Sequence, residues 1–213
     1  MGQWALQNKR RILQKERKMA ESLTEKSTKK VIIAILSVML FIAVIVPLIT
    51  SPTNKLLGES VYSVRSAFHG LFALTFMITS VIGLYQALHL WRGMEVNVSE
   101  VEIGSVVNAC ACFLAIFFGN WLYIPYRAQG GPRSHFLETA PELHKIFFEF
   151  KEFAALFTLP LTVAAAYIIC RYASRLIPNQ NLRDLVALLL VLNFFYFIVA
   201  FGLGAAITKI KAV

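Results

Sequence analysis

Hydrophobic residues in this chain gather in five long blocks, which short polar segments separate. Each block has about the 20 residues that a helix needs to cross a hydrocarbon layer of roughly 30 Å. We therefore predict five membrane-spanning helices, at residues 31–50, 65–90, 103–124, 143–170 and 185–207. The predicted fold class is an all-α integral membrane protein in which spans two to five form a helical bundle.

Breaker residues mark the ends of several spans. Ser51 and Pro52 close the first span, and Pro125 is expected to stop the third. Pro160 lies inside the fourth span and can kink it, because proline lacks the backbone donor that an α-helix uses. The longest connection, residues 126–141, is expected to be a loop.

Composition supports the membrane assignment. Of the 213 residues, 57% are hydrophobic and 15% are charged, and the mean hydropathy is +0.63. Soluble domains carry about 45–50% apolar and about 25% charged residues. This balance excludes an ordinary soluble enzyme, a disordered protein and a disulfide scaffold.

The net charge of +9 is concentrated near the N-terminus. Residues 1–30 hold nine Lys and Arg against three Glu, which gives +6. Trp4 is the one aromatic residue in this segment, which therefore lacks the stacking platforms of a single-strand binder, and no nucleic-acid partner is expected. The segment suits anchoring to anionic lipids on the cytoplasmic side, with a protein-docking arm as the alternative. The rest of the chain, residues 31–213, forms the five-helix transmembrane domain.

The distribution of Lys and Arg predicts the orientation. With the N-terminus inside, the cytoplasmic segments hold 13 of the 21 basic residues and the outer segments hold eight. The positive-inside rule favours this cytoplasmic N-terminus and an external C-terminus, and we expect a bacterial inner membrane. Residues 126–141 then lie outside, next to an aromatic belt of Trp121, Tyr123 and Tyr126.

Two of the four histidines are predicted to lie at similar depth on different helices. His69 falls in the first turns of the second span, and His144 opens the fourth, both near the outer face. His89 is 20 residues from His69 on the same helix, about 30 Å at 1.5 Å per residue, so these two cannot share a site. His135 lies in the outer loop. Imidazoles that face each other from two helices are what a haem needs for two axial ligands.

A haem also needs small side chains against its plane and cations near its propionates. Small or weakly polar residues share the helical faces of the two histidines, namely Gly70, Ala73, Met77 and Ser80 for His69, and Phe148, Lys151, Ala155, Thr158 and Thr162 for His144. Arg65, Arg127 and Lys151 are the candidate cations. The same features suit close packing of membrane helices and basic side chains that snorkel to water, so a bundle without a cofactor stays open.

This layout resembles membrane-bound b-type cytochrome subunits, which hold haem between histidines on separate transmembrane helices. The resemblance covers residues 65–207 at the level of architecture. It implies one haem b near the outer face with His69 and His144 as iron ligands, because His89 has no second histidine at its depth. It also implies a subunit of an electron-transfer complex, which passes electrons between a quinol and an external redox partner such as a cytochrome.

Charged residues crowd the start of the fourth span. Glu142, Lys145, Glu149 and Glu152 fall on one stripe, about 80–160° from His144 at 100° per residue. Charges this close to a span are costly unless they are paired or wet. Three interpretations stay open: a salt-bridged stripe, a proton path or quinol pocket in which Glu149 or Glu152 accepts protons, and a metal site shared with the histidines.

Polar residues within the other spans are few. Asn108, Asn120 and Asn193 can bridge helices by hydrogen bonds. No catalytic residue is assigned, and the chain is at most a subunit of an oxidoreductase.

Two further functions fit the same sequence. One is a chlorin pigment whose magnesium takes His69 or His144 as a single ligand. The other is an accessory subunit without a cofactor, which packs against larger membrane proteins.

Overall fold

The computed structural model describes residues 2–49 and 61–210, and every regular element within these ranges is helical. The elements run in the order α1 (Gly2–Ile49), α2 (Val61–Trp91), α3 (Val98–Arg127), α4 (Pro132–Thr139), η2 (Leu143–Phe148), α5 (Glu149–Leu176) and α6 (Gln180–Ile210). Within the described ranges, five helical segments are long and apolar enough to cross a membrane, which makes the chain an integral membrane protein. The predicted all-α fold is confirmed.

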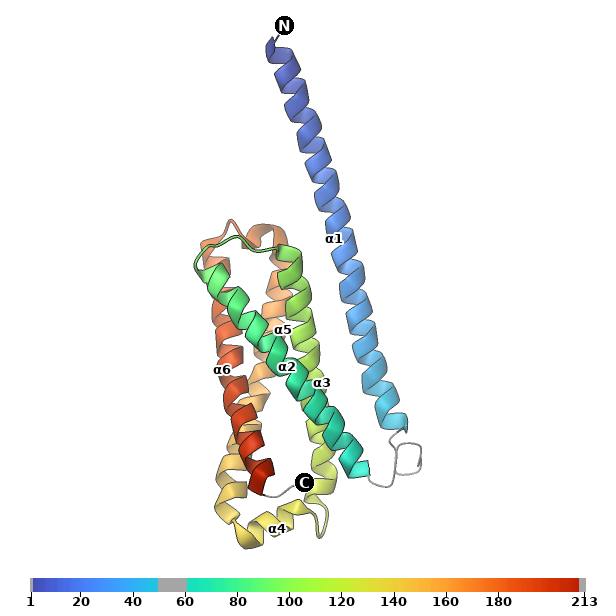
Figure 1. Cartoon of the computed structure of the whole chain (residues 1–213), viewed down its shortest axis with the longest axis vertical. Coiled ribbons are helices and arrows are strands. Elements are labelled where there is room, and N and C mark those ends of the chain that lie inside the picture. Colours follow the sequence, from blue (N-terminus) through green and yellow to red (C-terminus); the bar gives the residue numbers. More distant parts are fainter. Residues whose placement is uncertain (1, 50–60, 211–213) are drawn as a thin grey trace.

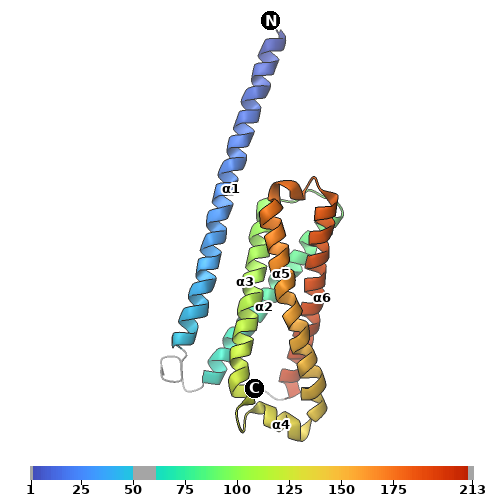
Figure 2. The same ribbon diagram turned by 180° about the vertical axis from the view of Figure 1, so that it is seen from behind.

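Four of the spans form the bundle. Helices α2, α3, α5 and α6 lie side by side, and α1 packs against the outside of α3 (Figures 1 and 2). This arrangement confirms the prediction that spans two to five form the bundle. The short helix α4 lies across one end, between the end of α3 and the start of η2 and α5 (Figure 2). We call this end of the bundle the α4 end.

The bundle is most tightly filled at the end opposite α4. Five apolar side chains, drawn from all four helices, are at most 1% exposed there: Leu90, Val101, Ile169, Leu176 and Val186. A second cluster packs the middle of the bundle, where the rings of Phe76 and Phe197 meet edge-on with centroids 4.6 Å apart. Any larger space between the four helices is therefore left toward the α4 end.

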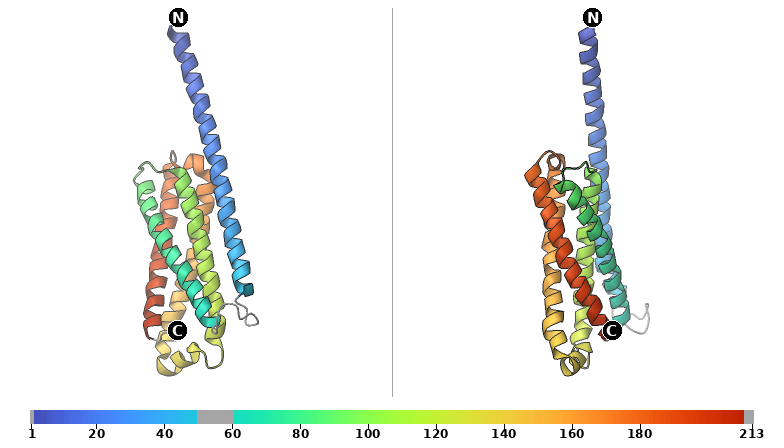
Figure 3. Two further views of the ribbon diagram at one scale, coloured as in Figure 1. Left: turned by 45° about the vertical axis from the view of Figure 1, so that its right-hand side comes forward. Right: turned by 60° about the vertical axis from the view of Figure 1, so that its left-hand side comes forward.

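Helix α1 is much longer than its membrane span. It runs unbroken for 48 residues, which is about 72 Å at 1.5 Å per residue. Met39, Ala43 and Val46 pack against α3, and the Thr28 hydroxyl donates to the Ser99 hydroxyl at 3.2 Å. The N-terminal part of α1 extends beyond the bundle (Figure 3). The basic segment predicted ahead of the first span is thus a helical continuation of that span.

The third span does not stop at Pro125, which corrects the sequence prediction. Helix α3 continues to Arg127, because a proline removes only one helical hydrogen bond, the bond to the carbonyl four residues earlier. That carbonyl belongs to Trp121, and Arg65 Nη1 donates to it at 3.4 Å. Membrane helices tolerate proline where a neighbouring helix satisfies the freed carbonyl in this way. In the fourth span, the backbone leaves helical dihedrals at Tyr172 rather than at Pro160.

The segment predicted as a loop, residues 126–141, contains the short helix α4. Pro132 begins this helix, where its missing amide hydrogen costs nothing. Two glycines make the preceding turn: Gly130 has a positive φ of 73°, and a Cβ on Gly131 would lie 2.7 Å from the carbonyls of Pro125 and Tyr126. The turn that sends the chain back across the bundle therefore requires glycine.

Candidate functional site

A cavity of about 440 Å³ opens between α2, α3, α5 and α6 at the α4 end. Its volume falls within the range of about 300–1,000 Å³ typical of small-molecule sites. Most of its wall is apolar or aromatic, and the polar residues that line it are Ser66, His69, Asn120, Tyr123, Tyr126, Lys151, Glu152 and Thr158. Parts of both predicted stripes line this cavity, namely Gly70 and Ala73 after His69, and Phe148, Lys151, Ala155 and Thr158 on the side of His144.

The imidazole of His69 is fixed by two residues of α3. Its Nδ1 lies 2.9 Å from the Ala115 carbonyl, and because a carbonyl only accepts, Nδ1 carries the hydrogen. A Cβ on Gly119 would lie 3.0 Å from His69 Cε1, so the ring fits in this position only because residue 119 is glycine. The other nitrogen, Nε2, has no hydrogen bond to a described residue. His69 therefore lines the cavity with one nitrogen anchored and the other left as an acceptor.

Lys151 brings a positive charge to the same cavity. Its ammonium lies 5.2 Å from the centre of the Phe148 ring, and its Cε is 3.5 Å from the position that a Cβ on Gly204 would take. Within the described ranges, the one ion pair closer than 4.0 Å joins Lys29 to Glu25, far from this site. An ionisable side chain inside a membrane span is a candidate functional residue, and Lys151 has no carboxylate of a described residue within 4.0 Å to neutralise it.

The structure separates the two glutamates predicted as proton acceptors. Glu152 lines the cavity, whereas Glu149 is exposed and does not. Beside Glu152 stands Tyr123, whose hydroxyl accepts a hydrogen bond of 2.8 Å from the exposed Arg127. The guanidinium of Arg127 also lies 4.2 Å from the centre of the Tyr123 ring. Glu152 thus lies between the cavity and polar groups at the surface.

His144 uses both of its ring nitrogens for contacts with the protein. It is 3% exposed and does not line the cavity. Arg133 Nε donates to its Nε2 at 3.2 Å, so the hydrogen of the neutral ring is on Nδ1, which donates to the Tyr126 hydroxyl at 3.1 Å. The structure therefore does not bring free nitrogens of His69 and His144 to a common space.

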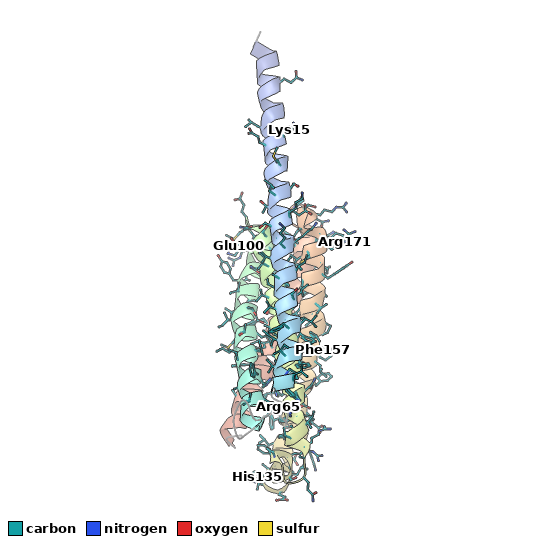
Figure 4. All side chains as sticks on the ribbon, turned by 90° about the vertical axis from the view of Figure 1, so that its right-hand side faces the viewer. Lys15, Arg65, Glu100, His135, Phe157 and Arg171 are labelled. Carbon is teal, nitrogen blue, oxygen red and sulfur yellow. The ribbon has the colours of Figure 1, made fainter. Side chains whose placement is uncertain are left out.

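The remaining predicted residues lie away from the cavity wall. Arg65 is 7% exposed, and its guanidinium lies 4.1 Å from the centre of the Trp121 ring. Figure 4 shows Arg65 and His135 toward the α4 end of the molecule. His89, at the far end of α2, contacts Tyr85, with ring centroids 4.2 Å apart and ring planes tilted by 46°. Of the three cations proposed for propionates, only Lys151 lines the cavity.

Sequence reasoning missed several residues of this site. Gly119 positions His69, Phe136 of α4 lines the cavity, and Arg133 donates a hydrogen bond to His144. Gly119 could have been noticed from the sequence, because a glycine followed by Asn120 interrupts the apolar run just before the aromatic belt. Phe136 and Arg133 reach the site because α4 folds back across the bundle, and no local sequence pattern predicts this fold.

Comparison with known proteins gives no relative. No protein-family model, no curated protein and no solved structure matches the chain.

Proposed function

We propose that this chain is a membrane subunit of an electron-transfer complex, and that its cavity binds a quinol. The observation that carries the proposal is a largely apolar cavity with His69 and Lys151 in its wall, where His69 Nδ1 is bonded to Ala115. A quinol has a flat ring with two oxygen atoms. His69 Nε2 can accept from a quinol hydroxyl, and Lys151 can donate to a quinone carbonyl or a phenolate.

Glu152 supplies the proton acceptor that quinol oxidation needs. Oxidation of one quinol to a quinone releases two electrons and two protons. The electrons pass to an external redox partner, and the chain provides binding, orientation and proton transfer. Glu152 lies at the cavity wall and beside Tyr123, whose hydroxyl is bonded to the exposed Arg127. This position supports a proton route from the cavity to the surface through Glu152.

A tetrapyrrole is the second candidate ligand, and one contact favours it. Histidines that bind metal usually donate their other ring N–H to a carbonyl or carboxylate, as His69 does to Ala115. His69 therefore fits as a single axial ligand of a haem b or a chlorin. A haem with two histidine ligands does not fit these contacts, because both nitrogens of His144 are bonded to Arg133 and Tyr126. When bound, the group would carry the electron itself.

The distribution of Lys and Arg supports an orientation of the chain in its membrane. It favours a cytoplasmic N-terminus and an external C-terminus, and we propose that the membrane is a bacterial inner membrane. The α4 end then faces outward, and the redox partner is an external protein such as a cytochrome. Other membrane subunits of the complex would pack against the lipid-facing sides of the bundle.

The ligand can be identified on the purified protein. The chain is isolated with its native lipids, its absorption spectrum is recorded oxidised and reduced, and the bound lipids are extracted. We expect about one quinone per chain and no haem or chlorin band. A sharp b-type band or red chlorin bands that His69→Ala removes would assign the tetrapyrrole instead. In either case His89→Ala, at the far end of α2, keeps the ligand. A preparation with neither ligand would contradict the proposal. It would favour the alternative function, an accessory subunit without a cofactor.

A further inference from the structure

Large side chains line the cavity at the α4 end, and we call them its floor. The floor consists of Tyr126, Phe136, Phe148 and Ile207, which come from α3, α4, η2 and α6. Phe136 is 1% exposed, and Tyr126 and Ile207 are each 5% exposed. The rings of Tyr126 and Phe148 stack with centroids 4.8 Å apart and planes 3° from parallel. These side chains therefore lie between the cavity and the α4 end of the molecule.

The helix that completes the floor is joined to the bundle at its two ends. Before α4 stand Gly130, in a left-handed conformation, and Gly131. After it stands Ala140, whose dihedrals (φ −151°, ψ 65°) are not helical. Because α4 is eight residues long and its N-cap makes no side-chain hydrogen bond, little within the helix itself holds it in place.

Besides the packing of the buried Phe136, one histidine ties α4 to the bundle. Across the described residues, the one side-chain hydrogen bond from α4 to another helix is the bond from Arg133 Nε to His144 Nε2. His144 in turn donates to the Tyr126 hydroxyl of α3. The imidazole thus joins three elements, and its burial strengthens both bonds because water does not compete for them.

We propose that α4 is a gate between the cavity and the water outside the membrane, and that His144 is its latch. When the Arg133–His144 bond breaks, α4 swings on its glycine turn and withdraws Phe136 from the floor. The closed gate excludes water from the site, so that protons leave only by a defined route. His144 is a positioning residue in this account, since it acts through α4 and Tyr126.

The test measures access to the cavity and uses no ligand, so its outcome is independent of the proposed quinol site. Cys110, Cys112 and Cys170 are replaced by serine, and Ala155→Cys places one thiol on the cavity wall. The full chain is reconstituted in vesicles, and a charged maleimide that cannot cross membranes is added from each side in turn. We expect slow labelling from the α4 side when the latch is intact.

The latch variant is Arg133→Gln, which changes an exposed residue and leaves the floor residues in place. Labelling from the α4 side should rise roughly tenfold or more, as expected for the loss of a partly buried hydrogen bond from a charged donor. His135→Ala, an exposed position on the same helix, is the matched control and should label as slowly as the parent. His144→Phe should match Arg133→Gln.

A neutral maleimide that dissolves in lipid separates gating from loosening of the fold. It should label the thiol at the same rate in all variants. Equal labelling by the charged reagent in the parent and in Arg133→Gln would overturn the gate, and so would a parallel rise with the neutral reagent.

Discussion

At the scale of single residues, Arg65 compensates for a proline on the neighbouring helix. Pro125 leaves the carbonyl of Trp121 without its helical donor, and the Arg65 guanidinium both donates to that carbonyl and stacks on the indole ring. A buried arginine thus works as a structural group in a span where a charge would otherwise be costly. Its contacts explain why α3 passes through the proline and delivers Tyr126 to the cavity floor.

Gly119 offers a sharp test of how His69 is held. Gly119→Ala would place a Cβ 3.0 Å from Cε1 and 3.1 Å from Nδ1 of His69, so the ring has to move away from the Ala115 carbonyl. We expect a loss of about 1–3 kcal/mol in the free energy of unfolding, as for other overpacked sites. The matched control is Gly83→Ala, whose Cβ would meet only the Leu190 side chain at 3.7 Å.

This control should be neutral or gain up to about 1 kcal/mol, since alanine favours a helix over glycine. Chemical unfolding of both variants in detergent measures the difference. If Gly119→Ala is as stable as Gly83→Ala, then close packing against Gly119 does not hold the His69 ring in place.

The sequence predicted part of the site and missed another part for definite reasons. His69, Lys151 and Glu152 were found because ionisable groups are rare in apolar blocks and stand out there. The pairing of His69 with His144 rested on equal depth, which says nothing of the hydrogen bonds that each ring makes. One bond of His144 comes from Arg133, which a folded α4 brings to it.

At the scale of helices, a polar network ties the middle of the bundle together. The Asn108 carbonyl oxygen on α3 accepts from Thr79 at 2.8 Å and from Ser80 at 3.1 Å, both on α2. Asn193 of α6 donates to the Ser80 hydroxyl at 3.3 Å. The prediction that asparagines bridge helices is confirmed for these two. Asn120 is exposed and lines the cavity instead.

This network gives a prediction about stability. Asn108→Ala removes two interhelical bonds, each worth about 0.6 kcal/mol on average in membrane proteins. We expect a loss of about 1 kcal/mol, measured as a shift in unfolding by denaturing detergent. Asn120→Ala, on the same helix but outside the network, should leave the midpoint unchanged. A larger shift for Asn120→Ala than for Asn108→Ala would show that the network does not join the helices.

The positions of the five spans could be predicted because apolar length alone decides whether a helix crosses a membrane. Three features of the elements could not. The helical extension of α1 is polar, α4 is short and amphiphilic, and the fourth span opens with the π-helix η2, which contains His144. Each of these depends on tertiary contacts or on backbone hydrogen bonds that periodicity does not report.

At the scale of the whole molecule, the bundle has a filled end and a hollow end. Large aliphatic side chains pack the end opposite α4, whereas small residues such as Ala73, Gly119, Ala155 and Gly204 face the cavity. Small residues usually let membrane helices approach closely, but here they border a cavity. The placement of His69 and Lys151 at this hollow end is the basis of the proposed function.

The most direct test of that function is a quinone titration. The chain is embedded in nanodiscs, and a quinone with a short tail is titrated by calorimetry into the parent protein, Lys151→Met and Lys145→Met. Lys145 is the matched control, because it is an exposed lysine of η2 outside the cavity. We predict that Lys151→Met weakens binding by roughly 10- to 100-fold, the loss of one hydrogen bond from a charged donor, while Lys145→Met binds as the parent does. A parent protein that binds no quinone, or a Lys151→Met variant that binds it with unchanged affinity, would contradict the account.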